Sequence, residues 1–179
     1  MRRVLIVVDM QKDFIDGALG TTEAQAIVKP VLEKMKTYEN SDIYLTRDTH
    51  GENYLETAEG RKLPVVHCVR HTEGWRLHPE IEKQAQPSHI IDKPSFGSME
   101  LMELLCQENK KESLEIELVG LCTDICVVSN ALLLKAAMPE NRIRVDAGCC
   151  AGVTPASHQA ALLTMEMCQI EIDGNCTAI

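Results

Sequence analysis

The 179-residue sequence lacks any apolar run of about eighteen residues, the length that a transmembrane helix needs. It also lacks a block of basic residues, and its formal net charge at pH 7 is −9. Both features argue against a nucleic-acid partner. Aromatic residues are scarce, at 3% of the chain, so few side chains are available to contact a planar ligand. The remaining composition, 45% hydrophobic and 25% charged, is ordinary for a soluble globular protein.

The N-terminus lacks the features of a secretory signal. Arg2 and Arg3 precede a short apolar run at residues 4–8, and Asp9 follows without a small-residue cleavage site. We therefore interpret the run as a buried strand and expect a cytoplasmic protein. The eight cysteines do not indicate a disulfide framework, because the sequence lacks secretory features and is long enough to bury a core. Five are expected to be small core residues: Cys68, Cys106, Cys149, Cys150 and Cys168.

Strand and helix patterns alternate along the whole chain, which predicts an α/β fold. We expect one Rossmann-like domain, residues 1–179, with helices on both faces of a six-stranded parallel sheet. The expected strands are residues 4–8, 42–46, 88–92, 113–120, 142–147 and 169–173. The expected helices are residues 23–38, with a kink or a late start at Pro30, 98–109, 124–138 and 155–168. Residues 47–62 are expected to form a long polar loop, and residues 63–69 a short extended segment.

Polar side chains gather where the expected strands end. In a parallel α/β sheet, ligands bind beyond the carboxyl ends of the strands. Chemically capable residues follow the first, second, third and fourth expected strands, so we expect them to lie at one edge of the sheet. These residues are Asp9, Asp48, His50, Lys93, Cys122 and Cys126.

Cys126 lies in the first turn of the expected helix 124–138, where unpaired N–H groups and the helix dipole favour a thiolate. Its spacing from Cys122 matches neither a thioredoxin-like redox pair nor a usual structural zinc pair. A nucleophilic cysteine needs a group that favours the thiolate and a group that moves protons, and Lys93 and Asp9 are candidates. The alternatives are an inert buried cysteine, a solvated lysine, a turn aspartate, or a redox switch that uses both cysteines.

A second cluster carries two imidazoles and a carboxylate. Asp48 and His50 lie on the same side of an extended segment, and His67 follows His50 by 17 residues. With open positions, these ligands suit a divalent metal such as zinc, or iron or manganese. The pattern is weak alone, and a polar loop is the alternative. The remaining histidines are interpreted as loop, packing or surface residues: His71, His78, His89 and His158.

Three segments, VLIVVDMQKDF, DKPSFGSM and GLCTDICV, resemble the signature segments of the isochorismatase-like cysteine hydrolases. RDTH and PVVHCVRHTEGW resemble the metal segment of the nicotinamidase (pyrazinamidase) branch of that superfamily. The resemblance covers nearly the whole chain and implies a six-stranded parallel sheet in dimers or larger homo-oligomers. It implies a catalytic triad and a set of metal ligands. The triad is Asp9, Lys93 and Cys126, and the metal ligands are Asp48, His50 and His67.

The resemblance also implies an oxyanion hole made by the backbone N–H groups of Cys122 and Cys126, with a cis peptide between Leu121 and Cys122. The implied activity is metal-dependent hydrolysis of an amide through a cysteine thioester, with nicotinamide as the substrate and zinc as the first choice of metal. A fourth metal ligand is expected from Glu56, Glu59 or water.

The sequence departs from the branch at the residue before His67, where an aromatic side chain usually stacks on the pyridine ring. Val66 stands there instead. Phe14 is then the main candidate for ring contact, with Phe96 or Tyr54 in support, and Leu121 is a second candidate for substrate contact. A second hypothesis is a hydrolase of the same superfamily that acts on another small amide, a carbamoyl compound or isochorismate.

Overall fold

The computed structural model describes residues 1–174 and confirms the predicted fold class. One all-parallel sheet has the strand order β3-β2-β1-β4-β5-β6. The strands are β1 (Arg2–Val8), β2 (Ile43–Asp48), β3 (Ile90–Lys93), β4 (Leu114–Leu121), β5 (Ile143–Ala151) and β6 (Glu171–Asp173). The predicted domain runs to residue 179, and its last five positions lie outside the described residues.

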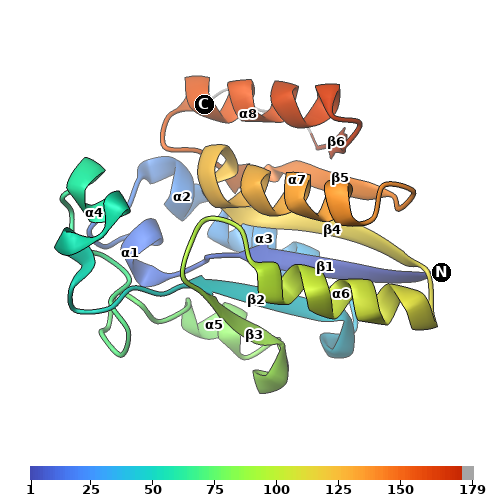
Figure 1. Ribbon diagram of the computed structural model, residues 1–179, viewed down its shortest axis with the longest axis horizontal. Helices are drawn as coiled ribbons and strands as arrows, with labels where there is room; N and C mark the ends of the chain where they lie inside the picture. Colours follow the sequence, from blue (N-terminus) through green and yellow to red (C-terminus); the bar gives the residue numbers. More distant parts are fainter. Residues whose placement is uncertain (175–179) are drawn as a thin grey trace.

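Helices cover both faces of the sheet, and Figure 1 shows α6 and α7 in front of it with α3 behind. The helices are α1 (Lys12–Ile15), α2 (Thr22–Ala26), α3 (Val28–Met35), α4 (Ala58–Lys62), α5 (Pro79–Glu82), α6 (Met99–Lys111), α7 (Val128–Ala137) and α8 (Pro155–Met167). Shorter helical turns are η1 (Asn40–Asp42), η2 (Tyr54–Glu56), η3 (Pro87–His89) and η4 (Thr123–Val127), the last a π-helical turn. Within the described residues, none of these helices has the length and apolar character needed to cross a membrane.

The continuous apolar run of β1 follows from its position between two cores. Val4, Ile6 and Val8 pack into the core under α6, α7 and α8. Leu5 and Val7 face the opposite core, which α1, α2, α3 and α5 complete. Because successive side chains of a strand point to opposite faces, a strand covered on both sides must be apolar throughout.

The structure corrects several expected element boundaries. The helix expected at residues 23–38 is two helices that meet at Ile27, three residues before Pro30, whose missing N–H and bulky ring disfavour a continuous helix. Residues 47–62 are not wholly loop, because they contain η2 and α4. Residues 63–69 form no strand, and Val69 makes only an isolated bridge to His50. The strand expected at 142–147 extends to Ala151.

The cysteines match the reduced state that the sequence indicates. The seven within the described residues are free. Cys68, Cys149 and Cys150 are buried as expected, and Cys106 is half-buried. The prediction for Cys168 is wrong: it lies at the C-terminal cap of α8 and is exposed, because the helix ends before its apolar face reaches that position.

Candidate active site

Three of the predicted residues meet at the carboxyl edge of the sheet, and we call them the cysteine group: Asp9, Lys93 and Cys126. Lys93 Nζ lies 2.6 Å from Asp9 Oδ2 and 3.3 Å from Cys126 Sγ. The exposed fractions are 0% for Asp9, 1% for Lys93 and 5% for Cys126. The lysine is therefore a buried cation between a carboxyl group and a sulfur atom.

The sheet fixes these positions. Asp9 follows the last residue of β1, and its backbone N–H donates to the Thr46 carbonyl of β2. The Thr46 hydroxyl donates in turn to Asp9 Oδ1 at 2.7 Å. Lys93 is the last residue of β3, paired in register with Asp48 of β2. Gly120, with φ +115°, lets β4 approach β1 closely, since a Cβ there would lie 2.2 Å from the Val8 carbonyl oxygen.

Burial sets the protonation of the group. Desolvation raises the pKa of Cys126 well above its usual value, Asp9 raises it further, and Lys93 lowers it. Desolvation also raises the pKa of Asp9, against the opposing charge of Lys93. For Lys93, burial acts to lower the pKa, but Asp9 and Cys126 raise it overall. The sequence indicates groups that favour a thiolate at Cys126, and Lys93 acts in that direction, whereas burial acts against it and favours the thiol.

The turn before α7 brings Cys122 and Cys126 to the same wall of the site. The peptide between Leu121 and Cys122 is cis, as the resemblance implied. The N–H groups of Ile125 and Val127 both donate to the Cys122 carbonyl, which produces the π-helical turn η4. Helical backbone therefore begins near residue 124 as predicted, but its first turn is π-helical and not α-helical.

His158 supports this turn, a role that its isolated position in the sequence did not signal. It was expected to be a packing or surface residue and is 8% exposed. Its Nδ1 lies 2.8 Å from the hydroxyl of Thr123, the first residue of η4. The Asp124 carboxylate accepts the backbone N–H of Val153. The first contact ties η4 to α8, and the second ties it to the segment between β5 and α8.

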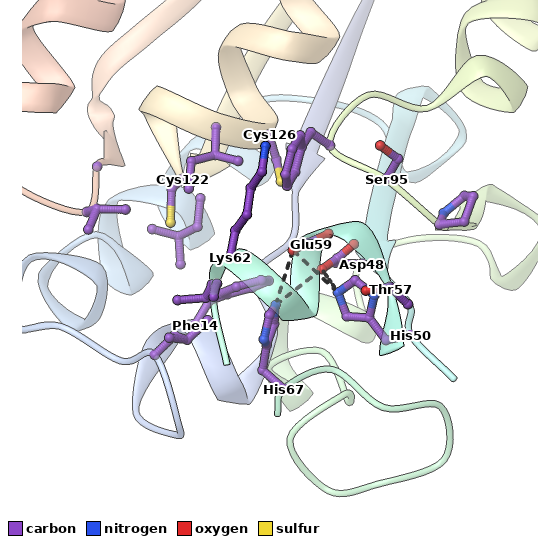
Figure 2. A pocket seen from close by; sticks show the side chains of 18 of the residues that line it. Phe14, Asp48, His50, Thr57, Glu59, Lys62, His67, Ser95, Cys122 and Cys126 are labelled. Atoms are coloured by element: carbon purple, nitrogen blue, oxygen red, sulfur yellow. Dashed lines mark ion pairs between the residues drawn. The ribbon is translucent and has the colours of Figure 1, made fainter. Parts of the chain in front are cut away.

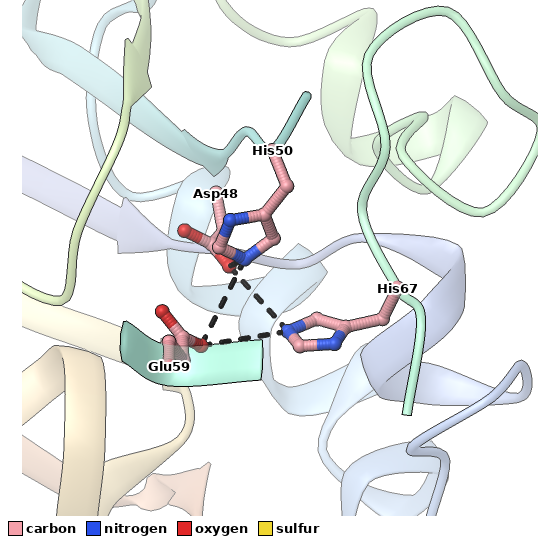
Figure 3. A group of neighbouring side chains, drawn as sticks. All are labelled: Asp48, His50, Glu59 and His67. Atoms are coloured by element: carbon pink, nitrogen blue, oxygen red, sulfur yellow. Dashed lines mark ion pairs between the residues drawn. The ribbon is translucent and has the colours of Figure 1, made fainter. Parts of the chain in front are cut away.

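A second cluster, the metal group, consists of Asp48, His50, Glu59 and His67 (Figure 3). One donor atom from each residue lies within 4.8 Å of all the others. His50 Nε2 is 2.9 Å from Asp48 Oδ2 and 3.8 Å from Glu59 Oε1. His67 Nε2 is 3.8 Å from each of the same two oxygens. The four donors converge on one point.

The donors fit a divalent metal ion. His67 Nδ1 lies 2.7 Å from the Val65 carbonyl oxygen, so Nδ1–H donates there and Nε2 keeps its lone pair toward the group. His50 Nε2 is buried, and its 2.9 Å contact with Asp48 Oδ2 lacks the geometry of a hydrogen bond, so the nitrogen remains available to a metal ion. Two imidazoles and two carboxylates are ligands that zinc accepts in a four-coordinate site. The prediction of a divalent metal at Asp48, His50 and His67 therefore gains a complete donor set.

Glu59 answers the question of the fourth protein donor, which the sequence left open among Glu56, Glu59 and water. The Thr57 side chain caps α4 by accepting the Gly60 N–H, and this cap places Glu59 in the first turn of the helix. Glu56 precedes the cap and is exposed. Thr57 is a helix-capping residue type, but the sequence alone does not show that it caps a helix here.

Both groups adjoin one cavity of about 670 Å³ (Figure 2). Its wall includes the four donors of the metal group, Cys122, Cys126 and Leu121. Phe14 lies in the wall with its ring centroid 5.5 Å from that of His67, and Phe96 also lines the cavity. Tyr54 is fully buried and packs against the two histidine rings at 4.7 and 4.9 Å instead of lining the cavity. Val66 is 51% exposed and does not line the cavity.

This arrangement, a cysteine group and a metal group at the carboxyl edge of a doubly wound parallel sheet, defines the isochorismatase-like class of α/β proteins. The chain belongs to the isochorismatase domain family, whose model matches residues 3–174.

Relatives of this chain carry amidase names. It is 26% identical to the nicotinamidase/pyrazinamidase of Mycobacterium tuberculosis, with 95% of this chain and 97% of the relative aligned. The pyrazinamidase of Pyrococcus horikoshii, solved in complex with zinc, superposes with a TM-score of 0.74 at 26% identity, covering 98% of this chain and all of the other. The pyrazinamidase/nicotinamidase of Streptococcus mutans gives a TM-score of 0.79 at 27% identity, covering 96% and 99%.

Proposed function

We propose that this protein is a metal-dependent cysteine amidohydrolase that converts nicotinamide and water to nicotinate and ammonia. One observation carries the proposal: Lys93 contacts both Cys126 Sγ and Asp9 Oδ2 directly beside a cavity whose wall holds four converging metal donors. The names of the relatives support amide hydrolysis, and the zinc in the Pyrococcus structure supports zinc as the metal here.

In the proposed first step, Cys126 attacks the amide carbon of the substrate. From the thiol form that burial favours, the proton of Cys126 passes to Asp9 as the carbon–sulfur bond forms. The positive charge of Lys93 stabilises the anionic sulfur during the transfer. The backbone N–H groups of Cys122 and Cys126 are assigned to the developing oxyanion, and removal of one donor of this kind typically costs about 3 kcal/mol.

In the second step, Asp9 returns the proton to the amide nitrogen, the carbon–nitrogen bond breaks, and ammonia leaves a thioester on Cys126. Water then gives a proton to Asp9 and adds to the thioester. The carbon–sulfur bond breaks, the proton moves from Asp9 to the sulfur, and the carboxylic acid departs. One carboxyl group thus serves as base and acid in turn, which requires a pKa that its surroundings raise toward neutrality.

Asp48, His50, Glu59 and His67 would hold the metal ion. A bound zinc ion would supply a Lewis acid for the pyridine nitrogen of the substrate, and this interaction would orient the ring. Phe14 and Leu121 supply the apolar wall against which the ring lies. The side chain of Val66 cannot take part from its exposed position, so the ring contact falls to Phe14.

Ammonia release by the purified, zinc-loaded protein tests the proposal. We expect release from nicotinamide and from pyrazinamide, with nicotinate or pyrazinoate formed in equal amount. No release from either amide by protein with bound metal and an intact thiol would contradict the substrate assignment. Two further expectations remain predictions: a cytoplasmic location, checked by cell fractionation, and a homo-oligomer, checked by light scattering.

A further inference from the structure

Lys62 is the one lysine among the described residues that line the cavity. It is the last residue of α4, the short helix that also provides Glu59. Figure 2 shows its side chain extending from α4 along the cavity toward the side where Cys122 and Cys126 lie. An ammonium group is therefore presented to whatever ligand occupies the space between the two groups.

Within residues 1–174, no carboxylate forms an ion pair with this ammonium. The two carboxylates in the cavity wall, Asp48 and Glu59, pair with His50 and His67. With a divalent ion bound, their charges are balanced, and Asp9 balances Lys93 behind the wall. The charge of Lys62 is then the excess positive charge of the loaded cavity, in a protein whose formal net charge is −9.

The cavity is also larger than a single-ring amide requires. Its volume, about 670 Å³, lies in the range typical of pockets for drug-sized ligands. Apolar side chains dominate the cavity wall, including Leu63, Phe96 and Ile125. An apolar wall with one unpaired cation favours a ligand with an apolar body and an anionic substituent, because a carboxylate pairs with an ammonium through a charge-assisted hydrogen bond.

We propose that Lys62 is a specificity-determining residue that extends the substrate class beyond nicotinamide to amides bearing a carboxylate in addition to the amide that is hydrolysed. This inference rests on the proposed amidohydrolase function and deepens it by naming the substrate class. The ammonium of Lys62 pairs with the second substituent, while the amide carbon stays at Cys126.

The experiment compares three amides that share one ring: nicotinamide, carbamoylnicotinate, which adds a carboxylate, and aminomethylnicotinamide, which adds a cation. The measured quantity is the ratio of kcat/KM for carbamoylnicotinate to that for nicotinamide. We expect Lys62→Met to lower this ratio about 10- to 100-fold, the value of one hydrogen bond to a charged group. Lys62→Glu is expected to lower it further and to raise the relative rate for aminomethylnicotinamide.

Lys83→Met is the matched control, because Lys83 is equally an exposed lysine at the end of a short helix but does not line the cavity. It is expected to keep the wild-type ratio. An unchanged ratio in Lys62→Met would overturn the inference, and so would an equal loss for all three amides, which would assign Lys62 to the reaction itself.

Calorimetry separates this inference from the proposed function. Binding of carbamoylnicotinate to zinc-loaded Cys126→Ala protein should weaken about 10- to 100-fold when Lys62→Met is added. If wild-type protein releases ammonia from none of the amides, the proposed function fails, and the binding measurement still decides the inference. Absence of any binding preference for the carboxylate contradicts it.

Discussion

The cysteine group and the metal group adjoin one cavity but depend on different parts of the fold. Asp9 and Lys93 sit at the ends of strands, and Cys126 sits in the turn after one, so the packed sheet determines all three positions. In the metal group, Asp48 is the last residue of β2 and His50 lies two residues beyond it, so the sheet also determines their positions. Glu59 and His67 instead come from residues 51–69, where short helical turns and one isolated bridge provide the only regular structure.

The two groups therefore differ in how firmly the fold holds them before a metal ion binds. Residues at strand ends keep their geometry because the core beneath them cannot rearrange cheaply. Residues on an irregular segment keep theirs only as long as local contacts or a bound ion hold the segment. We therefore expect the cysteine group to survive loss of the metal, while the segment that carries Glu59 and His67 loosens.

The largest expected effect is a loss of turnover at the cysteine group that leaves metal binding unchanged. Cys126→Ala removes the attacking atom and should lower nicotinamide turnover by at least about 10⁴-fold, as for other nucleophile deletions. Metal content, measured by mass spectrometry of the purified protein, should stay at the wild-type level. Cys122→Ala, which keeps its backbone N–H, is the control and should cost less than about tenfold. Turnover that survives in Cys126→Ala would refute the thioester route.

Glu59→Gln tests the metal group instead of the cysteine group. Loss of one anionic ligand should weaken zinc binding about 100-fold, measured by competition with a chromophoric chelator. Removal of zinc from the wild-type protein should lower Tm by roughly 10 °C, because an ion at a thousand times its Kd adds about 4 kcal/mol to the free energy of unfolding.

Glu56→Gln is the control for this experiment, since Glu56 is exposed on the same segment and outside the metal group. It removes the same charge and should leave zinc affinity within about threefold of wild type. An equal loss of affinity in both variants would show that the charge of the segment, and not a direct bond from Glu59, supports the ion.

The same comparison explains what the sequence could predict. Asp9 and Lys93 could be identified because each follows an expected strand, and the pattern of apolar residues predicts where a buried strand lies. Glu59 could not be separated from Glu56, because a helix of one turn has too few residues for periodicity. The capping contact of Thr57 distinguishes them, and such a contact is visible only once the chain is folded.

Two features of the site depend on its three-dimensional surroundings. The sequence indicates groups that favour a thiolate at Cys126, but the desolvation that raises the pKa of this cysteine depends on every atom around the sulfur and carries no local pattern. The π-helical turn η4 arises from two N–H groups that share the Cys122 carbonyl, and the apolar pattern of residues 124–138 is the same for either helix type.

The protonation of Cys126 provides a third test, in which one substitution has opposite effects on two rates. Burial and Asp9 raise the pKa of Cys126, and Lys93 lowers it. The thiolate fraction, and with it the rate of alkylation by iodoacetamide, should therefore rise about tenfold per pH unit from about pH 6 to pH 9. Asp9→Asn removes the anionic neighbour but leaves Lys93, so the pKa of Cys126 falls and alkylation at pH 7 should accelerate about tenfold.

Hydrolysis by Asp9→Asn should fall at the same time, because the asparagine cannot move a proton. Peptide mapping of the adduct distinguishes Cys126 from the other cysteines, and Asp16→Asn, on the exposed end of α1, is the control for charge removal. Slower alkylation of Cys126 in Asp9→Asn would show that Asp9 favours the thiolate, contrary to the electrostatics of the group.

The smallest expected effect concerns Gln11, which joins the two groups through the backbone of Asp48. Its side chain is fully buried, donates to the Asp48 and Trp75 carbonyl oxygens at 2.8 and 2.9 Å, and accepts the Asp48 N–H at 2.7 Å. Gln11→Leu leaves those backbone groups unpaired and should lower the free energy of unfolding by about 1–3 kcal/mol in urea titrations. Gln25→Leu, at an exposed position of α2, should change it by less than about 0.5 kcal/mol.

Gln11→Leu is expected to affect the metal group more than the cysteine group. Asp48 contacts both groups, with Oδ2 2.9 Å from His50 Nε2 and Oδ1 3.4 Å from Lys93 Nζ. Lys93 keeps its shorter contact with Asp9 when Asp48 shifts, whereas the metal group loses one of four donors. Zinc affinity should therefore fall several-fold while the alkylation rate of Cys126 changes by less than about twofold. A larger change at Cys126 than in zinc affinity would mean that Asp48 belongs to the cysteine group first.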